Sequence, residues 1–347
     1  MSLRLPVSAA ERDRFVLEHR GARAHLDPWH HQGVVIEDER TAAGDVARVA
    51  TVFLTGRECP WRCTMCDLWK HTTEADTPRG AIPAQIGAAR DELRDCVPAV
   101  TAMKLYNAGS FFDPRAVPVS DYGEIAARLI GLDHVIVESH PALIGQRVDL
   151  LLDALNQQQL WRRGFSPARS ADTEQPALEV AMGLETANPT ALDLLNKRFT
   201  IDQFRSAAAA LRARGIALRV FLLISPPFVS DEDQDAWLIQ SIDVAFASGA
   251  SVVSLVPTRS GNGAVERLAA AGLFREPSLE DVERSLAIGL AAAGGRGRVV
   301  VDLWDLQRFA SCPACFERRK TRLHTMNLAQ TVSAPSAACA CCGALDS

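Results

Sequence analysis

Long apolar runs are what this sequence lacks most clearly, and aromatic residues are also few. No stretch of its 347 residues approaches the roughly 20 consecutive apolar residues that a membrane-spanning helix needs. The polar start, Met1–Arg14, has no apolar core of the kind that signal peptides carry. Only two tyrosines are present, and aromatic residues make up 6% of the chain. We therefore expect a cytoplasmic protein without a membrane partner.

The chain also lacks an excess of positive charge. Its formal net charge is −5 and its isoelectric point is near 5.9, so no overall field draws the protein toward phosphates. This weighs against a nucleic-acid substrate, although an acidic protein can still carry a local basic groove. A hydrophobic content of 48% and a charged content of 23% are ordinary for a globular enzyme.

Cysteine, in contrast, is plentiful. The chain has nine cysteines and no export signal, and in a reducing compartment thiol clusters more often bind metals than form disulfides. Cys59, Cys63 and Cys66 lie in the run Cys-Pro-Trp-Arg-Cys-Thr-Met-Cys, directly after the first strong strand pattern. Thiolates are the usual ligands of iron–sulfur clusters, and three on one loop would leave one iron of a four-iron cluster open. A structural zinc site usually has four ligands, so a zinc knuckle, or three loose thiols, is the weaker alternative.

Short β-rich runs alternate with helical patterns along most of the chain. The six runs that predict strands are 49–55, 102–106, 134–138, 178–184, 217–224 and 252–256. The clearest helical patterns are 84–97, 147–160, 201–214 and 234–248. This alternation predicts a parallel sheet with right-handed crossovers. An open doubly wound sheet usually has a Gly-rich phosphate loop after its first strand. This chain has its cysteines there, so we expect a partial (β/α)6 barrel.

Other segments frame this barrel. Residues 8–23 predict a polar amphipathic helix, 298–303 a candidate seventh edge strand, and 164–175, rich in Ser, Pro and Arg, a loop insertion. The predicted organisation is an N-terminal helical extension, a partial barrel and a Cys-rich C-terminal segment, over residues 1–45, 46–295 and 296–347.

Candidate ligand-binding residues follow the predicted strands, because reactive groups of parallel α/β barrels gather where strands end and loops begin. After the second to fourth strands these candidates are Asn107, Gly109, Ser110, Glu138 and Glu185. Glycine at position 109 would allow a ligand to approach closely. Glu185 shares a strand face with small residues, which favours it as a partner for a ribose hydroxyl. Ordinary strand-to-loop turns are the alternative.

Arg219 interrupts an apolar strand pattern, Leu218–Ile224. A charge inside a buried strand is costly unless it is paired. Arg219 therefore either meets a carboxylate inside the barrel or lies at the solvated start of its strand. The next predicted strand leads into residues 257–263, which are either a ligand-contacting loop or a plain turn.

The C-x3-C-x2-C spacing of Cys59, Cys63 and Cys66 resembles the signature of the radical S-adenosylmethionine (radical SAM) superfamily. This resemblance implies a [4Fe–4S] cluster on the three thiolates, with its open iron chelated by the amino and carboxylate groups of SAM. One electron from the cluster then breaks a carbon–sulfur bond and yields a carbon radical. The resemblance further implies a flavodoxin- or ferredoxin-like electron donor. It also puts Met65 near the adenine, unless that side chain only packs the loop.

Four segments look like the elongator-catalytic-subunit-like branch of this superfamily, especially the group containing the archaeal archaeosine-synthase radical SAM subunit. They are residues 105–113, 137–141, 183–186 and 256–259. The resemblance covers roughly residues 50–275 and implies a tRNA nucleobase as substrate. Two departures favour a small molecule instead: the cysteines are spaced more tightly than in many members, and elongator's acetyltransferase-like domain is missing.

The remaining cysteines suggest a second site. Cys96 ends a helical pattern and is expected to be a small core residue. Five more follow residue 311: Cys312, Cys315, Cys339, Cys341 and Cys342. They offer enough sulfur for a closed zinc site or a second cluster; redox-active thiols and a site for a soft substrate are the alternatives.

Trivalent arsenic is the boldest soft substrate, because soft ligands select soft ions. In being small, acidic and cysteine-tailed, the chain resembles a radical SAM protein of arsinothricin biosynthesis. That resemblance implies transfer of the 3-amino-3-carboxypropyl group of SAM to thiolate-bound arsenite. A non-catalytic zinc or iron–sulfur binding protein is a further interpretation.

Overall fold

The computed structural model describes residues 7–163, 177–334, 339 and 341, with the side chains of 158–163 and 177 excepted. The predicted loop insertion at 164–175 lies outside these residues. Among those described, no helix combines the length and apolar character that crossing a bilayer requires.

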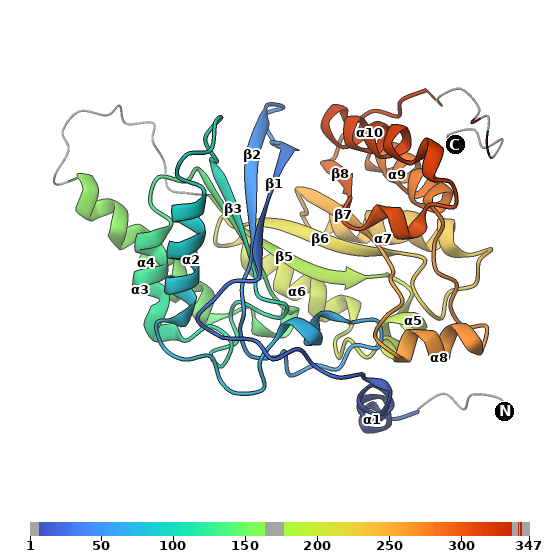
Figure 1. The fold of residues 1–347 in the computed structure, drawn as a ribbon, viewed down its shortest axis with the longest axis horizontal. Coiled ribbons are helices and arrows are strands. Elements are labelled where there is room, and N and C mark those ends of the chain that lie inside the picture. The colour runs from blue at the N-terminus through green and yellow to red at the C-terminus, as the bar shows by residue number, and fades with distance from the viewer. Residues whose placement is uncertain (1–6, 164–176, 335–338, 340, 342–347) are drawn as a thin grey trace.

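One eight-stranded sheet, curled into a partial barrel, organises the molecule, and its strand order follows the chain from β1 to β8 (Figure 1). β1 (Gly33–Arg40) runs antiparallel to β2 (Val46–Phe53), and β2 to β8 are parallel. The others are β3 (Ala102–Tyr106), β4 (His134–Glu138), β5 (Ala177–Glu185), β6 (Ala217–Ile224), β7 (Val252–Pro257) and β8 (Arg298–Val301). The predicted partial barrel is confirmed, with β2–β7 as the six predicted strands and β8 as the seventh.

β1 is the strand that the sequence did not predict, because half of it is a run of four charged residues, Glu37-Asp38-Glu39-Arg40, that gives no apolar period. It lies within residues 1–45, and β8 lies within residues 296–347, so strands from both flanking segments join the sheet. The three-part division of the chain stays a prediction.

Helices connect the parallel strands. Their bounds are α1 (Ala9–His19), α2 (Ala81–Glu92), α3 (Tyr122–Arg128), α4 (Gln146–Arg163), α5 (Pro189–Leu194), α6 (Ile201–Arg212), α7 (Gln234–Ala247), α8 (Ala264–Ala270), α9 (Leu279–Ala293) and α10 (Pro313–Ala329). The short 3-10 turns are η1 (Leu68–His71), η2 (Val119–Asp121), η3 (Pro141–Leu143) and η4 (Leu306–Phe309). Ser8, Thr200 and Ser278 start α1, α6 and α9 by accepting a hydrogen bond from the backbone N–H three residues on.

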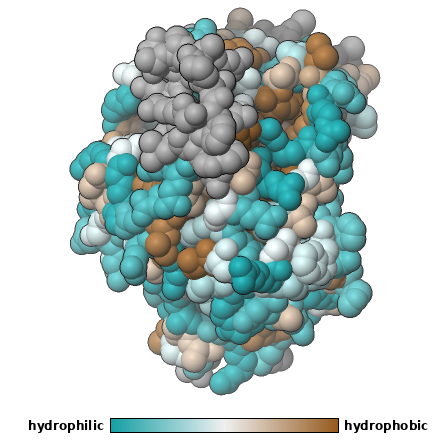
Figure 2. Space-filling view, turned by 90° about the vertical axis from the view of Figure 1, so that its left-hand side faces the viewer, coloured by the Kyte–Doolittle hydropathy of each residue, from teal (hydrophilic) through white to brown (hydrophobic). Residues whose placement is uncertain are grey.

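The helices lie in groups around the sheet. In Figure 1, α2, α3 and α4 stand together on one side, and α7, α9 and α10 on the other. The face formed by the first group is mostly hydrophilic, with small separate hydrophobic patches (Figure 2). The large hydrophobic core fills the space between the helices and the convex face of the sheet, with Val52, Leu105, Val137, Val180 and Leu222 from successive strands.

Charged side chains occupy the opposite, concave face. Arg219 on β6 is buried, and its Nε lies 2.5 Å from Glu179 Oε1 while its Nη2 lies 2.9 Å from Glu39 Oε2. Glu39 also accepts a hydrogen bond from Lys104. Burial alone would raise the pKa of Glu39, but Arg219 and Lys104 outweigh it and hold that pKa well below its usual value. The paired alternative predicted for Arg219 is therefore the one observed.

α10 covers the free edge of the sheet. Asn327 Oδ1 accepts a hydrogen bond from Val301 N and Asn327 Nδ2 donates one to Val301 O, each 2.9 Å long. Gln330 makes the same pair of contacts with Val299. Two side-chain amides thus satisfy β8 where a further strand would otherwise have to pair.

A buried ion pair ties α10 to α9. Arg319, 1% exposed, places its Nη2 2.6 Å from Glu283 Oε2 and its Nη1 2.7 Å from Glu280 Oε1.

We predict that Arg319→Ala lowers the free energy of unfolding by about 3 kcal/mol, because it leaves a buried carboxylate without its main cation. Arg205→Ala, which removes an exposed ion pair with Asp202, should cost less than about 1 kcal/mol. Urea unfolding of both variants provides the measurement, and equal losses would contradict the prediction.

Candidate functional site

The three loop cysteines lie between β2 and η1, at the carboxyl edge of the parallel strands. Cys59, Cys63 and Cys66 are free thiols and are partly buried. Burial, together with the neighbouring Cys63, raises the pKa of the Cys59 thiol to about 12. Among the described residues, the one group of three metal-ligand atoms within 4.8 Å of one another lies elsewhere. The loop sulfurs are therefore spread more widely than the ligands of a single small ion.

Two buried asparagines anchor this loop from neighbouring connections. Asn196, which follows α5, donates from Nδ2 to Arg62 O at 2.7 Å. Asn262, which follows β7, donates from Nδ2 to Thr64 O at 2.7 Å. The Thr64 N–H in turn donates to Leu195 O at 3.0 Å. The sequence left residues 257–263 as a ligand loop or a turn, and Asn262 instead holds the backbone between the cysteines.

The carboxylate next to the first cysteine, Glu58, forms ion pairs with arginines, two of them from the N-terminal segment. Glu58 Oε1 lies 2.7 Å from Arg20 Nη1 and 3.1 Å from Arg62 Nη1, and Arg23 binds its other oxygen. Although burial raises the pKa of Glu58, these arginines lower it more. The guanidinium of Arg20 also lies 4.8 Å from the ring centre of Trp69. Residues before the barrel therefore clamp the thiol loop.

The turn after β3 touches this loop. A Cβ atom added to Gly109 would lie 3.3 Å from Cys59 Cβ, so glycine permits the close approach. Ala108 adopts a left-handed backbone with φ of 55°. The Asn107 side chain is fully buried, and neither its Oδ1 nor its Nδ2 has a hydrogen-bond partner among the described residues. An unsatisfied buried amide costs roughly 1–3 kcal/mol, which indicates that a polar ligand would complete it.

Glu138, at the end of β4, faces the same turn. Its Oε1 accepts a hydrogen bond from Gly109 N at 3.2 Å. Burial raises the pKa of Glu138 to about 7, although backbone N–H groups of Gly109, Asn107 and Ala108 oppose the rise. Ser110 takes no part in this contact, because its Oγ accepts a hydrogen bond from His140 N at 2.7 Å.

Glu185, at the end of β5, is paired with a lysine that the sequence analysis did not select. Lys197 Nζ lies 2.8 Å from Glu185 Oε1, and both side chains are buried. Burial would lower the pKa of Lys197, but Glu185, Cys63 and Cys59 raise it above its usual value. The Glu185 carboxylate fills the space beside Gly183, where an added Cβ would lie 2.2 Å from Oε1. A strand-end carboxylate that requires a cation is the only sequence signal that could have pointed to Lys197.

Trp61 and Trp69 serve packing. The Trp61 ring stacks on His140 with centroids 3.6 Å apart, and His140 Nε2 lies 2.8 Å from Lys197 O. Burial, together with the positive charge of Lys197, lowers the pKa of His140 to about 3, so the ring is neutral. Trp69 is 3% exposed.

Met65 and Arg219 have protein partners of their own. Met65 packs against Val265, Leu268 and Phe274, which is the packing alternative considered for it. Arg219 is the third residue of β6 and is held by carboxylates inside the barrel. Contact of either residue with SAM stays a prediction.

Arginines also line a cavity of about 350 Å³ beside the thiol loop. The lining residues are Leu17, Arg20, Arg23, Arg57, Glu58, Pro60, Arg62, Glu74, Asp113 and Arg115. Five of these ten residues are arginines and three are acidic, so the lining has a small excess of positive charge although the whole chain is acidic.

The C-terminal cysteines do not all lie together. Cys312, Cys315 and Cys339 come together and are buried, whereas Cys341 is exposed and Cys342 lies outside the described residues. The core role expected for Cys96 is wrong, because α2 ends at Glu92 and Cys96 follows in a partly exposed turn.

A curated archaeal protein is similar to this chain. Archaeosine synthase subunit beta of Methanosarcina acetivorans is 26% identical over 259 residues, which cover 72% of this chain and 69% of that protein. No family model matches the chain. The predicted resemblance to the archaeosine-synthase branch is confirmed.

Two solved structures are also similar. Elp3 of Methanocaldococcus infernus is 12% identical with a TM-score of 0.45, over 63% of this chain. Coproporphyrinogen III oxidase of Escherichia coli, described as a radical SAM enzyme, is 14% identical with a TM-score of 0.42, over 70% of this chain. The chain spans about half, 51%, of each of these two structures.

The raised pKa of Glu138 predicts a pH dependence of stability. Because the folded pKa of about 7 lies above the ordinary value of 4.5, the folded protein holds this proton more tightly than the unfolded chain. Stability is therefore lost as the pH rises from about 4.5 through about 7. Glu138→Gln should gain on the order of 3 kcal/mol relative to the parent between pH 5 and pH 8. Urea unfolding at both pH values measures this gain. Glu124→Gln, on the exposed side of α3, is the control, and a parallel response of both variants would refute the assignment.

Proposed function

We propose that this chain is a radical SAM enzyme whose [4Fe–4S] cluster is held by Cys59, Cys63 and Cys66. The observation that carries the proposal is the close approach of Cys59, the first cysteine of the loop, to the turn that contains the unpartnered amide of Asn107. The donor set fits an iron–sulfur cluster, because it offers three soft sulfur ligands. Their spread beyond 4.8 Å favours several metal atoms over one.

SAM would bind at the neighbouring strand ends. Its amino-acid end carries an amino group and a carboxylate, and it suits the Asn107 amide, the backbone near Gly109 and Ser110, and the Glu138 carboxyl. Glu185, already oriented by Lys197, would receive a ribose hydroxyl. Met65 would contact the adenine from its position beside α8. When bound and reduced by a flavodoxin- or ferredoxin-like donor, the cluster and SAM supply a carbon-centred radical.

The chain's own residues would keep this region dry and rigid. Trp61 and His140 stack beside Lys197, and Asn196 and Asn262 fix the loop backbone. Exclusion of water protects reactive intermediates from side reactions. The buried ammonium of Lys197, close to Cys63 and Cys59, would offset part of the negative charge that three thiolates bring.

Single substitutions test the cluster and the SAM site together. Anaerobically purified Cys59→Ala, Cys63→Ala and Cys66→Ala should lose iron, the brown colour and reductive SAM cleavage. Asn107→Ala should keep the iron yet bind SAM at least about tenfold more weakly, since one buried hydrogen-bonding group is removed. Iron analysis, absorption spectra and chromatography of SAM-derived products provide the readouts.

Cys96→Ala is the matched control, because it removes a thiol outside the loop. It should keep both iron and SAM cleavage. Zinc in place of iron at the loop, or SAM binding unaffected by Asn107→Ala, would contradict the proposal.

For the substrate, we infer that a tRNA nucleobase is the candidate favoured by the five arginines of the cavity. Phosphate contacts dominate nucleic-acid affinity, and the relative from Methanosarcina acetivorans is named for archaeosine synthesis. Trp69 is buried and Trp61 already stacks on His140, so neither supports the proposal as a stacking platform for a base. A small molecule remains the alternative, with transfer of the 3-amino-3-carboxypropyl group of SAM to arsenite as its boldest form. That alternative is supported by the buried C-terminal thiols alone.

Salt-dependent binding distinguishes these substrates. Arg57 and Arg115 both pair with Asp76 at the rim of the cavity. The double variant Arg57→Gln/Arg115→Gln should bind total tRNA more weakly and should lower the slope of log Kd against log salt by about one per arginine. The control Arg205→Gln/Arg284→Gln removes two exposed, carboxylate-paired arginines elsewhere and should change neither quantity. Gel shifts at several salt concentrations measure both, and absence of tRNA binding by the unaltered chain would leave the small-molecule alternative.

A further inference from the structure

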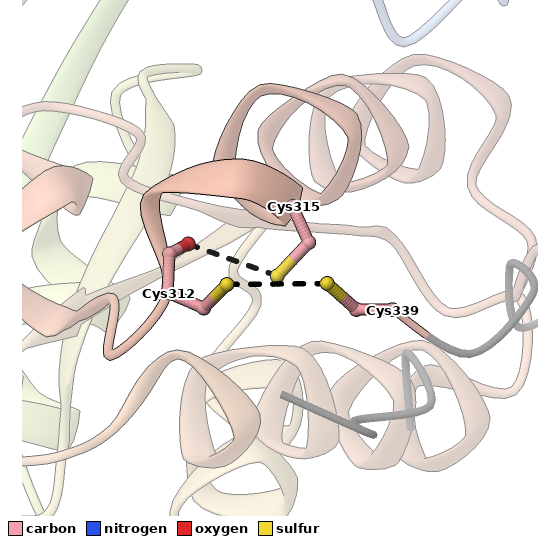
Figure 3. Close-up of side chains that lie close together, drawn as sticks. All are labelled: Cys312, Cys315 and Cys339. Atoms are coloured by element: carbon pink, nitrogen blue, oxygen red, sulfur yellow. Dashed lines mark hydrogen bonds between the residues drawn. The ribbon is translucent and has the colours of Figure 1, made fainter. Parts of the chain in front are cut away.

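Three buried thiols meet at the start of α10, away from the cluster loop in sequence. Cys312 is the residue before the first turn of α10, and Cys315 lies one turn later. Cys339 reaches them from beyond the other end of the helix (Figure 3). Their exposed fractions are 8%, 2% and 7%. The sequence therefore folds back over 24 residues to bring a third sulfur to a C-x2-C pair.

The spacing of these sulfurs fits one metal ion. All three lie within 4.8 Å of one another, and Cys312 Sγ and Cys339 Sγ are 3.9 Å apart (Figure 3). With zinc–sulfur bonds of about 2.3 Å, a tetrahedral site separates its sulfurs by about 3.8 Å. A disulfide requires about 2.05 Å between its sulfurs, and the 3.9 Å between Cys312 Sγ and Cys339 Sγ is much longer.

We propose that Cys312, Cys315 and Cys339 form a structural site for a single zinc-class ion. On binding, the three thiols release three protons to solvent, and the thiolates coordinate the dication. A fourth ligand completes the tetrahedron. The amino end of α10, a helix of 17 residues, adds a favourable partial positive charge beside the first two thiolates. No electron transfer is involved.

The ion would fix the segment around Cys339 to α10, the helix that covers the β8 edge of the sheet. α10 caps the β8 edge through Asn327 and Gln330, and Arg319 pins it to α9. The hydrogen bond from Arg322 Nη2 to Ser333 O, 2.9 Å long, is another anchor of the chain beyond α10. Three metal–sulfur bonds would add to the fixation of this segment.

The segment before Cys312 also reaches the cluster loop through two contacts. Arg308 Nη2 donates to Ser260 O at 3.0 Å, and Asn262, two residues further, holds Thr64 O. An ion at the start of α10 would therefore help to fix residues 260–262, which hold the backbone of the cluster loop. The inference itself stands on the three thiols and does not depend on the proposed function.

Metal analysis of the full chain tests the site. The chain, purified without oxygen from medium containing iron and zinc, should carry about one tightly held zinc. Cys312→Ser, Cys315→Ser and Cys339→Ser should each lose most of this zinc, keep their iron and unfold at a lower temperature. Cobalt loaded into the unaltered chain should show the intense sulfur-to-metal charge-transfer bands of tetrahedral thiolate sites, and zinc should displace it.

The controls separate this site from the cluster loop. Cys96→Ser should keep both metals. Cys59→Ser/Cys63→Ser should lose iron and keep zinc, so that failure of the proposed function leaves this result unaffected. The inference is overturned by a zinc-free chain, by zinc that survives Cys339→Ser, or by a second portion of iron and sulfide that Cys312→Ser removes. A chain that takes up arsenite but no zinc at these thiols would also overturn it, in favour of a thiophilic substrate.

Discussion

The candidate site depends on how an irregular loop is held in one shape. The segment between β2 and η1 has almost no backbone pairing of its own, so its carbonyls must be satisfied by other parts of the chain. Asn196 and Asn262 do this from two different connections, and both side chains are almost fully buried. An amide donates through two hydrogens in fixed directions. The positions of the cysteines therefore follow from the packing of the β5–α6 and β7–α8 connections.

The amino and carboxyl ends of the barrel strands differ in how their charged and polar side chains are paired. Glu39, Lys104, Glu179 and Arg219 neutralise one another on the concave face, toward the amino ends of the strands. At the carboxyl ends, the Asn107 amide has no partner and the Glu138 carboxyl has only backbone donors. The concave network is itself not complete, because Glu179 Oε2 has no hydrogen-bond partner among the described residues, and an unpaired buried polar group is costly wherever it lies. The candidate ligand-binding groups thus lie at the opposite ends of the strands from this charge network.

Much of this could be predicted from the sequence, and the failures have physical reasons. β2–β7 were predictable because their apolar runs bury one face against helices, and the loop thiols because ligand spacing is local. β1 was missed because its Glu37 and Glu39 point into the barrel, where cations replace apolar partners. Lys197 and Asn262 were missed because their roles depend on contacts with residues 12 and 198 positions away. Cys312 and Cys315 carried a readable spacing, but only the fold shows that Cys339, and not Cys341, joins them.

Backbone strain is concentrated around the same edge of the sheet. Eight non-glycine residues of the described chain have positive φ. Three of them, Ala108, Glu185 and Ser225, lie at or just after strand ends, and Asn196 and Arg198 lie between α5 and α6. Each such residue costs on the order of 1 kcal/mol and persists only where its surroundings impose the conformation. Asn196 and Arg198 flank Lys197, and the turn between them aims the ammonium at Glu185. Asn196 and Arg198 bind protein groups, Arg62 O and Asp13, so there the strained backbone serves to hold the thiol loop and the N-terminal helix in place.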